Sequence, residues 1–570
     1  MNQIQLRAAT QAAAAGRPRS GPRSGPITSG PILALLAAAA GVGTLAIRIA
    51  LHGAAFDLFG DEVIYADLGR SVITGGFPRF FGVVFFLHGP AFFYLESAWS
   101  WLAGKPPGLV TWIYEMRMLN AMLAGATAVV LVQLTARVSS LRAGLLAGAL
   151  FALDPFCIRQ NDRVLLETPM MLWVLLGYLL LISLIRRPRP AWAKTRAIGA
   201  GLLFGIAVLT KDEAALITIL PLAAAAVLRW GARRSLIALT VGATVLPYAV
   251  YVSVVAANGY ISGWWSAKTS GIERLLGVIQ TTGFHRSGSL SSRLIAEGGN
   301  FWTTYALLAL AIPAAWLVLR RGGPVARMMG LLYCAAGVTL AYAVALGTLE
   351  EQELYLLVVP SFVMISVGFT LRHMASHARP RSAARALIVV KTAAIMATLA
   401  VVFGLNVKTG VQWLRQPDDG YAHLLPYLAA NVPPGTAVDI PAASLPLSQS
   451  DGGRYELEGQ YRTGLWTTQS SMRKDHVRYI LVEWGPIDEG LSYLDPAQVR
   501  ALTGHARLLF SYTGRSYGQL ALYELPKTPD RSAKDKKGRA RRAVRAAVGV
   551  TGRPASGGGC PTGGCSRASP

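Results

Sequence analysis

Residues 205–222 read GIAVLTKDEAALITILPL. The charged residues 211–213 separate two apolar runs, 197–210 and 214–228. Apolar runs of about 15–20 residues are typical of helices that cross a membrane. This stretch therefore predicts a hairpin of two membrane spans, whose charged turn lies at a membrane surface.

Similar apolar segments recur along the 570 residues. They lie near 31–51, 80–103, 118–135, 141–157, 166–185, 235–256, 301–319, 328–347, 355–371 and 386–405. The composition agrees, because 52% of residues are hydrophobic and 15% are charged, against about 25% charged in soluble domains. These numbers exclude an ordinary water-soluble enzyme and a disordered chain. Four cysteines exclude a disulfide scaffold.

The net charge of +25 is at first sight that of a nucleic-acid binder, but the basic residues lie in short loops between the apolar runs. Five loops carry 17 Lys and Arg and no Asp or Glu: 136–142, 186–196, 229–234, 320–327 and 372–385. This is the pattern of cytoplasmic loops, so we expect no nucleic-acid partner. All sixteen acids before residue 405 fall outside these five loops.

The segment 80–103 decides the topology. If it does not cross the membrane, all five basic loops lie on the same side. The interruption His88-Gly89-Pro90 suits a re-entrant or surface-lying helix pair there. We therefore predict about eleven spans in a multi-pass protein of the plasma membrane, with a cytoplasmic N-terminus and a C-terminal region outside.

The composition divides the chain into four parts. Residues 1–30 are a basic cytoplasmic tail, 31–405 the transmembrane core, 410–525 a small extracytoplasmic α/β domain, and 526–570 a disordered basic, Gly-rich tail. Within the third part, 476–484 and 518–525 predict strands and 496–505 a short helix. The predicted fold class is a polytopic α-helical membrane protein with re-entrant or juxtamembrane helices and this small C-terminal domain.

The first predicted outer loop carries an acidic pair, Asp61-Glu62, directly after the first span. Paired carboxylates at a membrane surface suit a general base, a divalent-metal site or a plain polar cap. Tyr65 follows at helical spacing. No cofactor is certain from these residues, and any metal would bind at the pair.

Two further outer segments carry charges at span ends. Arg159 and Arg163 are spaced to share one helical face, with Glu167 at the mouth of the next span. This pattern suits either an anion site beside a carboxylate or a local ladder of ion pairs. Lys211 is placed to reach a lipid phosphate at headgroup depth, or to pair with its acidic neighbours. The acidic run 350–353 has the character of a solvated turn.

These motifs resemble the C-type glycosyltransferase superfamily, most closely glycosyltransferase family 39, which includes protein O-mannosyltransferases and aminoarabinose lipid A transferases. Asp61-Glu62 resemble the acidic motif of its first outer loop, and RVLLETP (163–169) its second-loop motif. His88-Gly89-Pro90 stands where a Pro-Pro motif is common, and Leu209-Thr210-Lys211 resembles its phosphate-side lysine motif. Gly89 and Glu167 depart from the family's usual residues, as does the acidic run 350–353.

The resemblance implies an inverting transfer of a hexose or pentose from a polyprenyl-phosphate donor to an acceptor hydroxyl on the outer face. Asp61 is then the base, and Glu62 orients it or the acceptor. Lys211, Arg163 and Arg159 are expected to bind the donor phosphate. Glu167, His88 and Tyr65 are expected at the substrate.

The expected partners are the lipid-linked sugar, membrane lipid, and a protein, lipid or cell-wall glycan as acceptor. Two alternatives remain at the level of the sequence. A lipid or solute transporter or flippase would show repeated halves and mid-membrane charges, and the chain shows neither. The other alternative is a ligase that moves a whole lipid-linked glycan.

Overall fold

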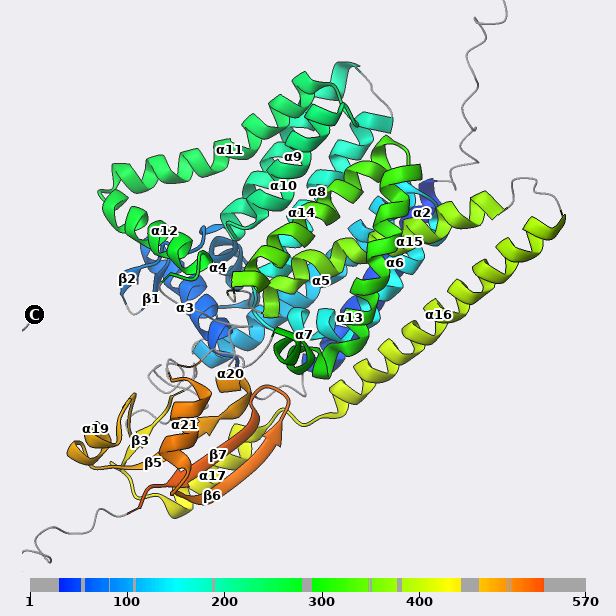
Figure 1. Cartoon of the computed structure of the whole chain (residues 1–570). Coiled ribbons are helices and arrows are strands. Elements are labelled where there is room, and N and C mark those ends of the chain that lie inside the picture. The colour runs from blue at the N-terminus through cyan, green and yellow to red at the C-terminus, as the bar shows by residue number, and fades with distance from the viewer. Residues whose placement is uncertain are drawn as a thin grey trace, which may run out of the picture.

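The computed structural model describes residues 30–526 except 53–56, 81, 106–108, 187–189, 279–289, 347, 349–350, 377–381, 442–460, 489–491 and 493. A bundle of long helices makes up most of it, and a small sheet domain lies at one end of the bundle (Figure 1). The predicted tails 1–30 and 526–570 fall almost wholly outside the described residues.

Eight described helices are long and apolar enough to cross a membrane. They are α2 (Gly30–His52), α5 (Leu109–Val138), α8 (Glu167–Arg186), α9 (Pro190–Thr210), α11 (Arg234–Ala257), α13 (Leu290–Arg321), α14 (Pro324–Leu346) and α15 (Tyr355–Ser376). α6 (Leu141–Leu153) and α7 (Pro155–Asn161) pass the same test together and are bent by 66°. The chain is thus a multi-pass membrane protein.

The remaining predicted spans also coincide with helices. α10 (Ala214–Leu228) forms the second arm of the hairpin quoted above and is 15 residues long, which is short for a span. α16 (Ser382–Arg415) contains the predicted span 386–405 and continues to the sheet domain (Figure 1). The bend between α6 and α7 has a local cause. Asp154 adopts extended backbone angles, its carboxylate accepts from Cys157 N at 3.0 Å, and Pro155 begins the next helix.

The segment 80–103 differs in part from the prediction. Only its second half is helical, as α4 (Ala91–Ala103). The first half forms a two-stranded hairpin, β1 (Arg79–Phe80) and β2 (Val83–Val84). The prediction of a helix pair is therefore wrong. Aromatic and β-branched residues favour strands, and Gly82 supplies the positive φ of +79° at the turn.

Three more elements lie outside the spans: α3 (Gly60–Gly75), α12 (Ile261–Leu275) and the 3₁₀ helix η1 (Glu351–Leu354). α3 ends at Gly76, whose φ of +80° requires a residue without a side chain. α3 packs against both α4 and α5. It therefore holds the acidic pair at its N-terminus against the bundle.

The C-terminal domain is built on a five-stranded sheet of order β4-β3-β5-β7-β6. Its elements are α17 (Gly420–Asn431), β3 (Ala437–Asp439), β4 (Arg462–Gly464), α19 (Gln469–Lys474), β5 (Val477–Glu483), α20 (Trp484–Asp488), α21 (Pro496–Thr503), β6 (Arg507–Gly514) and β7 (Gly518–Glu524). β3 pairs in parallel with β4 and β5, and β7 pairs antiparallel with β5 and β6. The two predicted strands and the predicted helix are observed.

The domain and the bundle share one hydrophobic core. Leu58 and Val63 beside the acidic pair belong to the same buried cluster as Tyr421 and Leu520 of the domain. This shared core fixes the domain against the start of α3.

Candidate active site

Asp61 and Glu62 occupy the first turn of α3, but their side chains have different surroundings. Glu62 is fully buried and closes a capping box by accepting from Phe59 N at 2.7 Å. Asp61 is partly exposed and accepts a hydrogen bond from Gln352 Nε2 at 3.0 Å. Of the pair, Asp61 is the carboxylate that an incoming substrate can approach.

Glu62 is held by two buried guanidinium groups. Arg117 on α5 donates through Nε at 2.9 Å and through a second nitrogen at 2.5 Å, and Arg163 donates at 2.8 Å. Burial alone would raise the pKa of Glu62, but the two arginines and these hydrogen bonds lower it to about 2. Both carboxylate oxygens are thus occupied, which favours a positioning role for Glu62, and its place among the catalytic groups stays a prediction.

Lys211 and Glu167 form a buried ion pair with Nζ and Oε1 2.5 Å apart. Glu167 begins α8, and Lys211 lies in the turn between α9 and α10. Burial opposes the charge on Lys211, but the Glu167 carboxylate keeps the pKa of Lys211 well above its usual value. A cation therefore persists at the end of the hairpin, as the sequence predicts.

This ion pair lies close enough to Asp61 to act on its charge. Burial raises the pKa of Asp61 to about 6, the Glu167 carboxylate adds to the rise, and Arg274 and Lys211 oppose it. A carboxylate with a pKa near 6 is mostly ionised at neutral pH and is a better proton acceptor than an ordinary aspartate. These are the properties that a general base needs.

His88 and Tyr65 complete the same cluster. Their rings lie edge to face with centroids 6.0 Å apart. Burial, then Lys211 and Lys268, hold the pKa of His88 well below its usual value, so the imidazole is neutral. The His88 loop reaches Lys211 because Gly89 lies against the backbone of Leu209, where a Cβ would come within 2.2 Å of the carbonyl oxygen.

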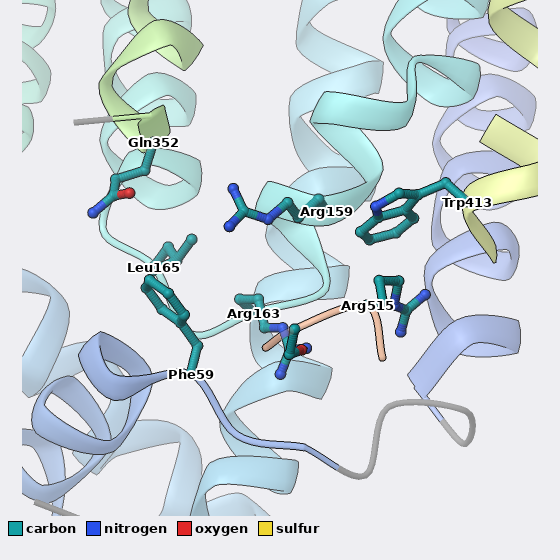
Figure 2. Close-up of a pocket in the computed structure, with 8 residues that line it drawn as sticks. Phe59, Arg159, Arg163, Leu165, Gln352, Trp413 and Arg515 are labelled. Atoms are coloured by element: carbon teal, nitrogen blue, oxygen red, sulfur yellow. The ribbon is translucent and has the colours of Figure 1, made fainter. Parts of the chain in front are cut away.

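The last two predicted residues, Arg159 and Arg163, line a separate small pocket (Figure 2). They do not share a helical face, because α7 ends at Asn161. Arg163 binds Glu62 and, at 2.7 Å, Asp418. Its guanidinium therefore joins the loop to the C-terminal domain through two carboxylates, and its role in binding the donor phosphate stays a prediction.

Several residues of the site carry no sequence signal. Arg117 and Arg274 lie in apolar or mixed segments, Gln352 is the amide within the acidic run 350–353, and Asp418 and Arg515 lie about 250 and 350 residues from Arg163. Only the fold brings them together. Asp57 shows the same long-range closure, because its carboxylate accepts from the backbone nitrogens of Gly420 and Tyr421 at 2.9 and 3.0 Å.

The acidic pair does not fit a metal. In the described part of the chain, no group of three or more His, Cys, Asp or Glu residues is placed to hold an ion. Glu62 has both oxygens engaged by arginines and backbone amides, which leaves Asp61 as a single open carboxylate. A divalent ion prefers several oxygen ligands, so no step below uses one.

Residues 94–262 match the family model described as dolichyl-phosphate-mannose-protein mannosyltransferase. No curated protein sequence matches the chain significantly.

Solved structures resemble most of the chain. One is the archaeal oligosaccharyltransferase AglB from Archaeoglobus fulgidus, in complex with an inhibitory peptide and a dolichol-phosphate (14% identity, TM-score 0.53, 87% of this chain and 74% of that one). Another is ArnT from Cupriavidus metallidurans, bound to undecaprenyl phosphate (13% identity, TM-score 0.50, 88% and 99%). Together with the family match over residues 94–262, this shared fold confirms the resemblance to C-type glycosyltransferases that the sequence predicted.

Proposed function

We propose that the protein transfers a sugar from a polyprenyl-phosphate donor to an acceptor hydroxyl at the outer face of the plasma membrane, with inversion at the anomeric carbon. One observation carries the proposal. A partly exposed carboxylate with a raised pKa, Asp61, lies beside a buried cation, Lys211, where a membrane hairpin ends. A base next to a phosphate-binding cation is what this reaction requires.

The reaction divides between these two groups. The acceptor oxygen attacks the anomeric carbon while its proton passes to the Asp61 carboxylate. The bond from the anomeric carbon to the phosphate oxygen breaks, and its electron pair leaves with the phosphate. A phosphate needs no proton to leave, but its added charge needs stabilisation, and Lys211 is the cation for it. Glu167 holds Lys211 in place.

The donor class rests on the family match and on two structures. The AglB structure is a complex with a dolichol-phosphate, and the ArnT structure is bound to undecaprenyl phosphate. A charged hairpin turn between two apolar helices is suited to a lipid whose phosphate lies at headgroup depth. In this orientation the N-terminus is cytoplasmic and residues 410–525 are outside the cell.

Transfer from radiolabelled polyprenyl-phosphate sugars, in membranes that contain the protein, tests the proposal. A panel of hexosyl and pentosyl monophosphate donors and one lipid-pyrophosphate glycan separates a sugar transferase from a glycan ligase. We expect label to enter an acceptor fraction from one monophosphate donor, with the product anomer opposite to that of the donor. Movement of intact lipid across the bilayer without a covalent product would instead indicate a flippase.

A further inference from the structure

The pocket that Arg159 lines is separate from the Lys211–Glu167 pair. It lies where the first outer loop, the segment after α7 and the turn between β6 and β7 meet (Figure 2). Three arginines line it, Arg159, Arg163 and Arg515, and none of its lining residues is acidic. Such a concentration of guanidinium groups is typical of sites that bind phosphate or carboxylate.

Arg515 carries unused hydrogen-bonding capacity into this pocket. Its side chain is 1% exposed, and its Nη2 lies 3.2 Å from Asp418 and 3.6 Å from Asp162. Its Nε and Nη1 are buried, with no hydrogen-bond partner among the described residues. The guanidinium stacks on the ring of Trp413, 4.3 Å from its centroid. Buried cationic donors without acceptors are costly, and an oxyanion would satisfy them.

The other two arginines differ in what they offer. Arg163 is neutralised by Glu62 and Asp418. Arg159 packs between two aromatic rings, those of Phe59 and Phe301, each 5.9 Å from its guanidinium carbon. Arg515 therefore contributes the two buried N–H donors without a partner, Arg159 contributes a second guanidinium to the lining, and Arg163 is held in place by its carboxylate partners.

Gln352 links this pocket to the reacting groups. It lines the pocket, and its Nε2 donates to Asp61 at 3.0 Å. Asp61 thus lies between two cationic regions. One is Lys211 at the membrane hairpin, and the other is the arginine pocket, whose far wall is formed by Arg515 and Ser516 of the C-terminal domain.

We propose that the arginine pocket binds an oxyanion, a phosphate or a carboxylate, that is carried by the acceptor. The proposal rests on the proposed transfer reaction. The side chain of Gln352 spans the gap between this pocket and Asp61. An acceptor whose anionic group lies in the pocket can therefore place its hydroxyl near the Asp61 base. The donor phosphate already has Lys211, whereas the arginine pocket includes a wall from the C-terminal domain, formed by Arg515 and Ser516. The acceptor is therefore an acidic molecule, and neutral analogues are poor acceptors.

Binding of simple anions tests the pocket without any need for transfer. The full-length protein in neutral-lipid nanodiscs is unfolded by heat in phosphate, in acetate and in chloride at equal ionic strength. We expect phosphate or acetate to raise the midpoint of wild type above that in chloride, and Arg159→Gln or Arg515→Lys to remove the rise. Arg507→Gln, which breaks a surface pair with Glu524 in the same domain, is the matched control and should keep it. No anion-specific rise in wild type, or a rise that both pocket variants retain, overturns the pocket as an anion site.

Measuring donor binding shows whether the anion in the pocket comes from the acceptor or is the phosphate of the donor. We expect the dissociation constant for a polyprenyl phosphate to stay within about twofold of wild type in Arg159→Gln and Arg515→Lys, and to rise at least tenfold in Lys211→Gln. In the transfer assay, the two pocket variants should raise the acceptor KM severalfold and leave the donor KM unchanged. A tenfold loss of polyprenyl-phosphate binding in the pocket variants would assign the pocket to the donor and overturn the acceptor assignment. If the pocket binds anions but the protein transfers sugar from no donor, the proposed function is refuted, and so is the assignment of the pocket to the acceptor.

Discussion

Replacing Glu62 with glutamine separates the positioning carboxylate from the base beside it. The Glu62 carboxylate accepts three hydrogen bonds from two buried guanidiniums and two from backbone amides. Glutamine keeps one accepting oxygen, turns an NH₂ group towards an arginine, and removes the negative charge that forms ion pairs with both Arg117 and Arg163. Breaking a buried pair in this way costs about 3–5 kcal/mol. Asp61→Asn is the matched control, because it removes a charge with a single hydrogen bond to a side chain and should cost under about 1 kcal/mol.

The assay is thermal unfolding of the detergent-solubilised protein, followed by the fraction that stays monodisperse. We expect Glu62→Gln to lower the midpoint by several degrees and reduce the yield of folded protein, while Asp61→Asn matches wild type. The surviving folded Glu62→Gln protein should retain part of its transferase activity. A Glu62→Gln protein as stable as wild type but without activity would refute the reasoning and return Glu62 to the catalytic groups.

Four further outcomes follow from the same geometry. The initial transfer rate should fall about tenfold per pH unit below pH 6, because protonation of Asp61, whose pKa is about 6, removes the base; a flat profile from pH 7 to 4.5 would contradict this. Lys211→Gln should weaken polyprenyl-phosphate binding at least tenfold in equilibrium binding, and unchanged binding would remove this cation from the donor site. Gly89→Ala should lower both the folded yield and the activity, because its Cβ would meet a carbonyl of α9 at 2.2 Å, whereas Gly242→Ala in open space should be neutral. Asp418→Asn leaves two buried guanidiniums without their shared carboxylate, which should lower stability by about 2 kcal/mol or more. Limited proteolysis should therefore cleave the segment before α17 faster than in wild type.

Much of the fold follows from local sequence. Apolar runs separated by basic loops predicted the spans. The segments bounded by turn residues predicted the strands β5 and β7 and the short helix α21. These signals are local, because the burial pattern and backbone preference of an element are set within a few residues. The prediction of a helix pair over 80–103 failed because apolar composition does not distinguish a short aromatic hairpin from a helix. In the structure, the positive φ of Gly82 at the turn belongs to the hairpin and not to a helix.

The site was predictable where the charges lie at span ends. Asp61, Glu167 and Lys211 were identified from their positions, and the fold brings them together. Arg163 shows the limit of that reasoning. Its carboxylate partner Asp418 lies 255 residues away, and no local pattern reveals that a distant domain neutralises it.

The central claim is that Asp61 is the base of a sugar transfer. The most direct measurement is transfer from the radiolabelled polyprenyl-phosphate sugar by Asp61→Asn at matched expression, with Glu115→Gln on α5 as an acid-to-amide control. General-base catalysis contributes about 10²–10⁴-fold, so we expect the Asp61→Asn rate to fall at least 100-fold, with donor binding within a few-fold of wild type and the control unaffected. A rate for Asp61→Asn equal to that of wild type would contradict the account.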